Sequence, residues 1–282
     1  MIDTINKLHK RVITLVLVLF SFAEAPAQEI ALQLYSLRNQ LKTDVEKYHE
    51  IIGQWGIRYV EGGGTYDMPM KAYQDLLEKN DLQLVSVGGS YEEMRDNPQE
   101  VIDKAKAFGA KYIVTFWIPH TSGLFGEKEA KTAVEVFNKA GKLVQDAGLV
   151  YCYHPHGYEF KPYQAGTLFD YMAANATHYN FQMDVFWVQM GGVDPMSLLK
   201  KYPQKFPLLH LKDRKPGTQG TSDGTGNVET NVVLGTGDID ISAIIRKAKE
   251  IGVEYLIIED ESSSSVSQIP QSVDYINSIL KE

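Results

Sequence analysis

The sequence predicts an α/β protein in which eight strand and helix units close into a (β/α)8 barrel. Short apolar runs suited to strands recur along the chain, amphipathic helical patterns fill the intervals, and glycine often marks the turn into the next strand. Strands that alternate with helices in this way are typical of parallel βαβ units, and eight units in about 250 residues match the size of one barrel. A doubly wound open sheet is the alternative. It is disfavoured because no Gly-x-Gly-x-x-Gly motif follows the first strand.

Apolar runs bounded by turn residues predict strands at residues 30–35, 57–61, 82–87, 112–117, 149–153, 180–184, 208–212 and 255–259. Helices are predicted in the intervals from apolar side chains spaced three and four residues apart. The longest such pattern has its apolar face at Val134, Phe137, Ala140, Leu143 and Val144. Glycines follow helices where a left-handed residue is preferred, at Gly56, Gly109, Gly148 and Gly252. Residues 267–280 are predicted to form the last helix.

Residues 1–27 have the features of a secretory signal peptide. A basic segment at residues 7–11 precedes an apolar run at residues 12–22, and small residues end at Ala27. A membrane anchor is the alternative, but the apolar run is shorter than the roughly 20 residues that a spanning helix needs. We therefore expect cleavage after Ala27, export to the periplasm or the extracellular space, and no stable membrane insertion. Residues 28–282 are then a single catalytic barrel domain.

Charge and cysteine content limit the partners and the means of stabilisation. The chain has 28 Lys and Arg against 36 Asp and Glu, for a net charge of −8, which argues against nucleic acid as a partner. Cys152 is the only cysteine, so no intrachain disulfide can form. We expect Cys152 to be a small buried apolar residue, with a reactive thiol as the alternative, and side-chain packing to hold the fold together.

Chemically active side chains gather where the predicted strands end. In a barrel, the carboxyl ends of the strands and the loops that follow them share one face, and catalytic groups lie on that face. Residues of this kind occur after the second strand and after the fourth to eighth strands. They are Glu61, Trp117, His120, His154, His156, Glu159, Asp184, Trp187, His210, Lys212, Asp213, Glu259, Asp260 and Glu261.

A divalent metal would explain why Asp184, His210 and Glu259 each end an apolar strand. Without a cation, two carboxylates and an imidazole at one rim would lose hydration, and the carboxylates would repel each other. His154 is the natural fourth ligand, from the neighbouring strand. Mixed carboxylate and imidazole ligands favour Mn²⁺, with Zn²⁺, Co²⁺ or Mg²⁺ as alternatives. The competing interpretation is a set of ordinary hydrogen-bonded residues at a wet barrel rim.

The other candidate site residues at this face each allow two or more roles. Glu159 is a ligand, an acid or base for the substrate, or a carboxylate that orients His156. Lys212 binds a substrate oxygen or stabilises an enolate; the alternative is a salt bridge with a rim carboxylate. Trp117 and Trp187 form the floor of a sugar pocket, or serve packing alone.

Two loops are also informative. The segment 216–236 is rich in Gly, Thr, Ser and Asn, and is a mobile lid or an ordinary surface insertion. Asp240 is expected to cap the helix that follows it. The four serines at residues 262–265 predict a flexible linker.

At these residues the chain resembles the xylose-isomerase-like TIM-barrel superfamily, a group of sugar isomerases and epimerases that also includes inosose dehydratases and the endonuclease IV type. The resemblance covers nearly all of residues 28–282. The motifs that carry it are Gln33-Leu34-Tyr35-Ser36-Leu37-Arg38, Glu61-Gly62-Gly63-Gly64-Thr65-Tyr66, Tyr153-His154-Pro155-His156-Gly157-Tyr158-Glu159-Phe160, Met183-Asp184-Val185-Phe186-Trp187, Leu209-His210-Leu211-Lys212-Asp213 and Ile258-Glu259-Asp260-Glu261.

The resemblance implies a single divalent metal held by residues from strands five to eight, with vicinal substrate oxygens completing its shell. Asp184, His210 and Glu259 match that pattern, and Tyr35, Glu61, Trp117 and Trp187 are expected to contact the substrate. The family commonly has a glutamate on strand five that works as a pair with the strand-eight glutamate. This chain has His154-Pro155-His156 there, so His156 or Glu159 supplies the missing base, or the reaction differs.

The expected reaction begins with proton removal next to a carbonyl, stabilised by the metal and assisted by Glu259, His156, Glu159 or Lys212. A metal-dependent isomerase or epimerase that acts through an enediolate is the first expectation. A 3-keto-glycoside lyase or hydrolase, and a non-catalytic carbohydrate-binding barrel, are the alternatives. Export favours a non-phosphorylated sugar or glycoside as the substrate. A homo-oligomer is compatible with the sequence.

Overall fold

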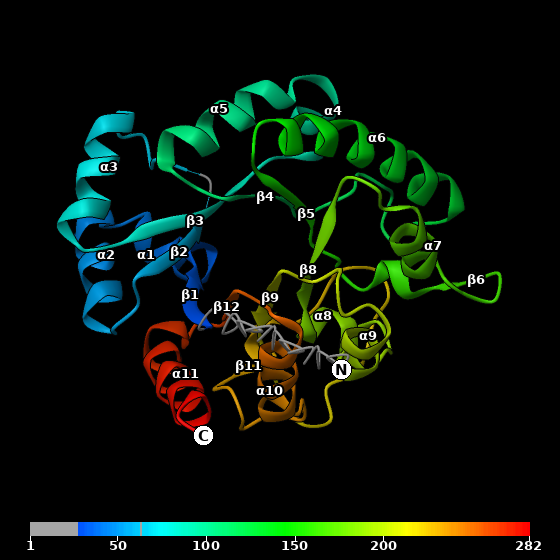
Figure 1. The fold of residues 1–282 in the computed structure, drawn as a ribbon. Helices are drawn as coiled ribbons and strands as arrows, with labels where there is room; N and C mark the ends of the chain where they lie inside the picture. Colours follow the sequence, from blue (N-terminus) through cyan, green and yellow to red (C-terminus); the bar gives the residue numbers. More distant parts are fainter. Residues whose placement is uncertain (1–27, 63) are drawn as a thin grey trace, which may run out of the picture.

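A closed barrel of eight parallel strands forms the centre of the molecule in the computed structural model, which describes residues 28–62 and 64–282 (Figure 1). The barrel closes because β1 pairs with β2 on one side and with β12 on the other, which excludes the open sheet. Around the barrel the strand order is β1-β12-β9-β8-β5-β4-β3-β2. The strands are β1 (Glu29–Gln33), β2 (Tyr59–Gly62), β3 (Gln83–Gly88), β4 (Tyr112–Thr115), β5 (Val150–Tyr153), β8 (Asn180–Asp184), β9 (Leu208–Leu211) and β12 (Tyr255–Ile258).

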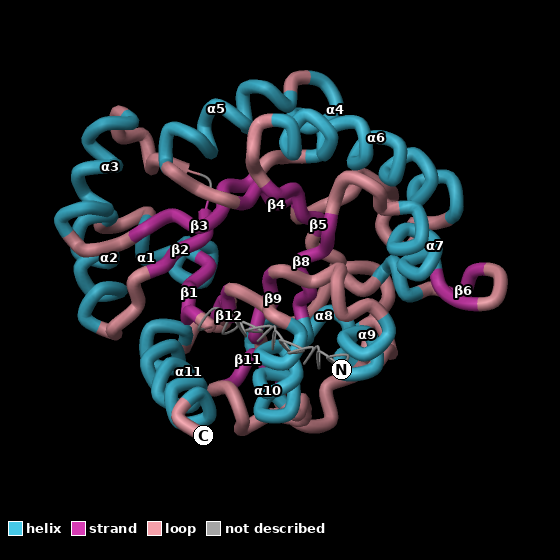
Figure 2. Tube along the Cα trace, in the orientation of Figure 1, coloured by secondary structure: helices cyan, strands magenta, loops and turns pink. Residues whose placement is uncertain are grey.

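Helices surround the strands (Figure 2). They are α1 (Arg38–Leu41), α2 (Val45–Gln54), α3 (Met70–Lys79), α4 (Tyr91–Asp96), α5 (Pro98–Phe108), α6 (Glu127–Asp146), α7 (Leu168–Asn175), α8 (Val185–Met190), α9 (Pro195–Lys201), α10 (Ile241–Ile251) and α11 (Ser265–Leu280), with single 3-10 turns η1 (Leu34–Leu37), η2 (Tyr158–Phe160) and η3 (Val228–Thr230). Two small antiparallel pairs are added, β6 (Pro162–Tyr163) with β7 (Gly166–Thr167) and β10 (Asp213–Arg214) with β11 (Asn231–Val232).

All eight strands predicted from the sequence are present, with ends that differ by up to two residues. The predicted left-handed glycines are confirmed, since Gly56, Gly109, Gly148 and Gly252 have φ angles of 77°, 68°, 81° and 80°. Asp240 caps α10, as expected, by accepting a hydrogen bond from the Ala243 N–H. The signal peptide predicted at residues 1–27 lies outside the described residues. Among the described helices, none has both the length and the apolar character needed to cross a membrane.

Two local predictions were wrong. Leu143 was assigned to the buried face of α6, yet its side chain is 45% exposed, because the buried stripe runs through Ala140, Gly141 and Val144 instead. Residues 262–265 are not a flexible linker. Ser262 is buried and donates a hydrogen bond from its hydroxyl to Asp260 at 2.7 Å, and α11 already begins at Ser265. Short hydroxyl side chains satisfy the backbone groups at a helix start, which is why serines concentrate there.

The barrel interior changes from apolar to polar along the strands. Its apolar layer consists of Ala31, Val85, Tyr112, Val114, Cys152, Leu208 and Ile257. Strand side chains alternate with period two, so the next side chain on the same face lies two residues further on. On four of these strands that side chain is polar and nearly or fully buried, at Gln33, His154, His210 and Glu259. The strands therefore deliver polar groups onto an apolar floor, and Cys152 is a free buried residue of that floor, as expected.

Packing outside the barrel fixes β5, the strand that leads to His154. Phe137 of α6 is fully buried, and its ring centroid lies 5.7 Å from that of Tyr151 and 5.0 Å from that of Tyr153. Burial of one such aromatic side chain contributes roughly 1.5–3 kcal/mol. The outward face of β5 is thereby held against a helix, and its inward face is left for the site.

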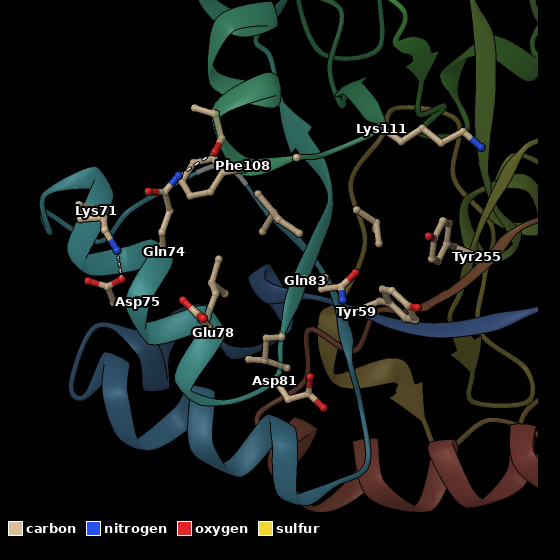
Figure 3. Close-up of a pocket in the computed structure, with 16 residues that line it drawn as sticks. Tyr59, Lys71, Gln74, Asp75, Glu78, Asp81, Gln83, Phe108, Lys111 and Tyr255 are labelled. Atoms are coloured by element: carbon tan, nitrogen blue, oxygen red, sulfur yellow. Dashed lines mark hydrogen bonds and ion pairs between the residues drawn. The ribbon is translucent and has the colours of Figure 1, made fainter.

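A hollow of about 620 Å³ opens at the opposite end of the barrel, where β2, β3 and β12 begin (Figure 3). Most of its charged groups form ion pairs, either with one another, as Lys71 and Asp75 do, or with residues beside the hollow, as Lys111 does with Glu254 at 2.6 Å. None of the strand-end histidines or carboxylates lines it. This arrangement agrees with the rule that the amino-terminal face of a barrel serves stability.

Candidate metal centre at the carboxyl ends of the strands

Four side chains that end four neighbouring strands meet inside the mouth of the barrel. They are His154 after β5, Asp184 at the end of β8, His210 in β9 and Glu259 after β12. One ligand atom from each lies within 4.8 Å of all the others. The convergence predicted from the sequence is therefore confirmed, and the group has the size and chemistry to hold one divalent cation.

Asp184 presents one buried carboxylate oxygen without a hydrogen-bond partner among the described residues. Its Oδ1 accepts hydrogen bonds from the backbone N–H groups of Phe186 at 2.8 Å and Trp187 at 3.1 Å, at the start of α8. Its Oδ2 is buried without a hydrogen-bond partner in the described structure. Burial raises the pKa of Asp184 to about 7, because the charged form lacks solvation. A bound cation would supply the missing partner, so the donor set fits a metal.

His154 is held with one ring nitrogen free for the cluster. Its Nδ1 lies 2.9 Å from Gln182 Oε1, which places the proton on Nδ1. Its Nε2 then carries the lone pair and lies 3.7 Å from Asp184 Oδ2. Burial, with His210 and His156 nearby, lowers the pKa of His154 well below its usual value. The neutral ring is the form that binds a metal.

His210 is oriented by carboxylates on both sides. Its Nε2 lies 2.5 Å from Glu61 Oε1, and its Nδ1 lies 3.2 Å from Glu259 Oε2. Burial alone would lower the pKa of His210, but the two facing carboxylates outweigh it and raise the pKa to about 10. Glu61 holds the proton on Nε2 of His210. A cation could therefore bind at Nδ1, where it would replace the proton that the ring carries in its charged form.

Glu61 was expected to contact the substrate, and the structure places it below the cluster instead. It is fully buried and does not line the pocket. Besides the His210 ring, it accepts hydrogen bonds from Gln33 Nε2 and Gln182 Nε2, both at 2.8 Å, and from the Ser86 hydroxyl. Since Gln182 also holds His154, one carboxylate supports both imidazoles of the cluster.

Lys212 lies beside Glu259 in a buried position. Its Nζ is 3.6 Å from Glu259 Oε2, pairs with Glu261, and lies 5.5 Å from the centroid of the Trp187 ring. Burial would lower the pKa of Lys212, but Glu259 and Glu261 outweigh it and hold the pKa above its usual value. Burial alone would raise the pKa of Glu259. The positive charges of Lys212 and His210 outweigh this effect, hold the pKa well below its usual value and keep the carboxyl ionised.

A pocket of about 810 Å³ opens above the cluster. Of the residues expected to contact the substrate, Tyr35, Trp117 and Trp187 line it, together with His154, His156, Glu259 and Glu261. The glycine-rich segment 216–236 also reaches the pocket, where Gly224, Thr225, Gly226 and Val228 form part of the wall. Whether that segment moves as a lid stays a prediction.

His156 faces this pocket, and Glu159 does not. The Nδ1 of His156 lies 3.3 Å from the backbone oxygen of His154, and its ring lies between Trp117 and Trp187, with centroids 5.5 Å and 5.3 Å away. This enclosure lowers the pKa of His156 to about 4. Glu159 is fully buried, accepts hydrogen bonds from the His156 backbone N–H at 3.1 Å and from the Tyr153 hydroxyl, and is absent from the pocket wall. Burial raises the pKa of Glu159 to about 7.

The sequence interpretation missed two kinds of functional residue. Gln33 and Gln182 position the cluster, and Gln182 had a visible signal because it lies two residues before Asp184 on the same inward face. Arg38 and Lys42 line the pocket from the turn after β1. They had no comparable signal, because the direction of a loop side chain is not set by strand periodicity.

Comparison with known proteins agrees with this geometry. Residues 50–279 match the family model described as a xylose isomerase-like TIM barrel. An inosose dehydratase of Clostridium perfringens (strain ATCC 13124) is 28% identical over 246 residues, which cover 75% of this chain and 80% of that protein. A crystal structure of a sugar phosphate isomerase/epimerase from Parabacteroides distasonis ATCC 8503 is similar with a TM-score of 0.73 and 24% identity, covering 90% of this chain and 97% of that one.

A crystal structure of the IOLI protein with a bound zinc atom is similar with a TM-score of 0.66 and 15% identity, covering 90% of this chain and 96% of that one. At these identities the two solved structures establish the fold. The family match spans most of the chain, and the barrel with its strand-end cluster agrees with it. The chain therefore belongs to the xylose isomerase-like TIM-barrel family and is a sugar-modifying enzyme of that superfamily.

Proposed function

We propose that this enzyme is a metal-dependent lyase, which removes a proton next to the carbonyl of a keto-sugar and expels the substituent β to that carbonyl. One observation carries the proposal. The carboxylates that line the pocket, Glu259 and Glu261, both follow β12, while β5 contributes only the imidazoles of His154 and His156. Glu159, the first carboxylate after β5 in sequence, is buried outside the pocket wall.

This asymmetry favours elimination over epimerisation. In the epimerase pattern of the family, two glutamates on opposite faces of the sugar exchange a proton with one carbon. That exchange needs a second base, because the proton returns from the other side. Elimination needs a single base at the carbon, since the C–H electron pair becomes part of the new double bond and the carbon is not reprotonated. The β substituent leaves with the electron pair of its own bond to carbon. The pocket offers one imidazole, His156, for that task.

We propose Mn²⁺ as the metal, with Zn²⁺, Co²⁺ and Mg²⁺ as alternatives, because the donor set mixes imidazole nitrogen with carboxylate oxygen. His154 Nε2, Asp184 Oδ2, His210 Nδ1 and the Glu259 carboxylate would hold it. When bound, the cation supplies Lewis-acid stabilisation of the negative charge that develops on the substrate oxygen.

The remaining steps belong to the side chains around the cluster. With its Nδ1 proton directed to the His154 carbonyl, His156 has its lone pair on Nε2 and takes the proton from carbon. Lys212 keeps Glu259 ionised and in place through their contact at 3.6 Å. Trp117 and Trp187 enclose the His156 ring and limit the access of water to the reacting carbon.

The curated relatives support the same chemistry, because a dehydratase removes water from its substrate. A 3-keto-glycoside undergoes the equivalent reaction, with the aglycone leaving in place of water. Export, proposed from the predicted signal peptide, favours such non-phosphorylated substrates. Amino-terminal sequencing of the exported protein should find Gln28 as the first residue. A full-length protein that stays inside the cell with residues 1–27 attached would oppose export.

The test is release of 4-nitrophenol from 4-nitrophenyl 3-keto-β-glucopyranoside by the purified enzyme with Mn²⁺. We expect the His156→Gln enzyme to lose about 100-fold or more in kcat while its Mn²⁺ affinity is unchanged. The matched control is His120→Gln, since the His120 ring also lies beside Trp117, with ring centroids 4.9 Å apart, but does not line the pocket. If deuterium from the solvent is incorporated at the carbon next to a ketose carbonyl, and no substituent is lost, the isomerase is favoured instead. Binding without either reaction would contradict both.

A further inference from the structure

We propose that the mouth of the pocket is a subsite for an aromatic leaving group with an anionic substituent, so that the substrate is a keto-glycoside of an aromatic acid. This inference rests on the proposed lyase function. The subsite consists of Tyr35, Arg38 and Lys42 from the turn after β1, with Trp117 from the loop after β4.

Two exposed aromatic rings supply the apolar part of the subsite. Tyr35 is 54% exposed and Trp117 is 39% exposed, whereas most large apolar side chains of this protein are buried. Both rings line the same pocket, and they follow strands that are separated by two others in the barrel. They therefore stand at different sides of the mouth. Exposed rings at a pocket wall lose water contact when another flat ring stacks on them, which favours an aromatic ligand.

The position of the Tyr35 ring is fixed by Arg38. The Arg38 guanidinium lies 4.6 Å from the Tyr35 ring centroid and donates hydrogen bonds to the backbone oxygens of Tyr35 at 3.1 Å and Glu261 at 3.0 Å. A guanidinium held by carbonyl oxygens keeps its full charge. The aromatic wall therefore carries a fixed cation at its edge.

One of the two cations that line the mouth, Lys42, has no carboxylate partner among the described residues. Arg38 has one carboxylate within 4.0 Å, Glu261, and that carboxylate is shared with the closer ammonium of Lys212. Lys42 lines the pocket four residues after Arg38 and forms no ion pair among the described residues. Glu259 and Glu261 also line the pocket, but both contact the buried ammonium of Lys212. An anionic group on the ligand would neutralise the charge of Lys42.

The pocket has room for two rings. Its volume of about 810 Å³ lies in the range of roughly 300–1,000 Å³ that accommodates drug-sized ligands. A sugar ring at the metal cluster reaches His156, and the mouth remains for the group attached at C1. A keto-cyclitol without an aglycone would leave Tyr35, Arg38 and Lys42 without contacts.

The reaction balances without a further reactant. The base takes the proton from C2, next to the C3 carbonyl, and the C2–H electron pair forms the C1–C2 double bond. The C1–O bond breaks, and the aglycone oxygen takes up a proton and leaves as a phenol. The carbonyl is retained in the sugar product, so no oxidant or reductant is consumed.

Binding of unoxidised ligands tests the subsite independently of turnover. Calorimetry on the Mn²⁺ enzyme should show 4-carboxyphenyl β-glucopyranoside binding roughly five- to tenfold more tightly than the neutral 4-carbamoylphenyl analogue. The Arg38→Gln and Lys42→Gln enzymes should each lose part of this preference, and 1 M salt should reduce it. Lys128→Gln is the matched control, because it removes an exposed cation of α6 that does not line the pocket.

Equal affinity for the two ligands, or equal losses in the Lys42→Gln and Lys128→Gln enzymes, would overturn the subsite. So would a failure of the carboxylate ligand to bind. Binding of glucose 6-phosphate as tight as that of the carboxylate ligand would also overturn it, since glucose 6-phosphate has no aromatic ring. If the charge preference holds but no 3-keto-glycoside is cleaved, the subsite stands and the lyase proposal fails. If cleavage occurs without the preference, the lyase stands and the subsite fails.

Discussion

His210 Nε2 lies 2.5 Å from Glu61 Oε1, and both side chains are fully buried. The same carboxylate accepts a hydrogen bond from Gln182, whose amide oxygen faces His154 Nδ1. A residue at the end of β2 therefore sets the orientation of both imidazoles, although neither follows it closely in sequence. Partners of this kind fix the ring orientation and the basicity of metal-binding histidines.

Replacement of Glu61 should weaken metal binding without abolishing the fold. In Glu61→Gln the charge that holds the Nε2 proton of His210 is lost, and the amide matches only part of the hydrogen-bond pattern. We expect the Mn²⁺ affinity to fall by about 10- to 100-fold, measured by calorimetry. Glu92→Gln, an exposed substitution on α4, is the control. An unchanged affinity in Glu61→Gln would show that the hydrogen bonds to the imidazoles do not support the cluster.

Asp184→Asn should have opposite effects on the metal-loaded and metal-free protein. The amide removes a charged ligand, so Mn²⁺ binding should become undetectable. Burial raises the pKa of Asp184 to about 7 without metal, so ionisation at pH 8 costs stability that the neutral amide avoids. In the presence of a chelator at pH 8, thermal unfolding of Asp184→Asn should therefore occur at a higher temperature than that of the wild type. A lower temperature would argue against the unsatisfied Oδ2.

Glu159 should make stability fall as pH rises. Burial raises the pKa of Glu159 from an ordinary value of 4.5 to about 7. The folded state therefore holds a proton that the unfolded state releases, and this contribution is complete below pH 4.5 and lost as pH rises through about 7. At 1.36 kcal/mol per pKa unit, Glu159→Gln should gain about 3 kcal/mol over the wild type between pH 4.5 and 8. Urea unfolding of the two Mn²⁺-loaded proteins at both pH values measures the difference, and parallel pH profiles would refute it.

Gly224 should be required for the shape of the pocket wall. Its φ is +77°, and a Cβ atom there would lie 2.8 Å from Tyr158 Cδ1 and 2.9 Å from Trp117 Cζ3. Gly217 has a similar φ of +83° but no atom within 4 Å of its Cβ position. Both alanine variants should lose about 1 kcal/mol of stability from backbone strain. Only Gly224→Ala should displace the wall and raise KM, by roughly tenfold. A similar KM in both variants would show that Gly224 and its loop do not contribute to substrate binding.

The barrel and the four-residue cluster were predictable, because both follow from periodicity. Apolar runs fix the positions of the strands. A polar side chain at a strand end points to the same side as the residue two positions before it, so His154 points inward because Cys152 does. The fates of Glu61 and Glu159 were not predictable in this way. Glu159 follows Gly157, whose φ of 96° reverses the chain so that the η2 turn folds back and buries the carboxylate.

Charge alone does not determine which strand-end carboxylate faces a pocket. Glu61 and Glu259 both follow apolar strands, yet a register shift between Val60 and Glu61 accompanies the pairing of β2 with β3, and Glu61 lies lower in the barrel. Such irregularities depend on the neighbouring strand. The same reason applies to Arg38, whose guanidinium donates a hydrogen bond to the backbone oxygen of Glu261, a residue distant in sequence.

The position of β12, the last strand of the barrel, determines when the four ligand side chains can come together during folding. Glu259 follows β12, and β12 is the strand that joins β1 to β9 and closes the cylinder. A chain that has been synthesised or folded only as far as β9 has three of the four ligand side chains but no closed wall to hold them together. A cation bound as proposed would therefore meet its full ligand set only after closure, and it would stabilise the finished barrel by mass action.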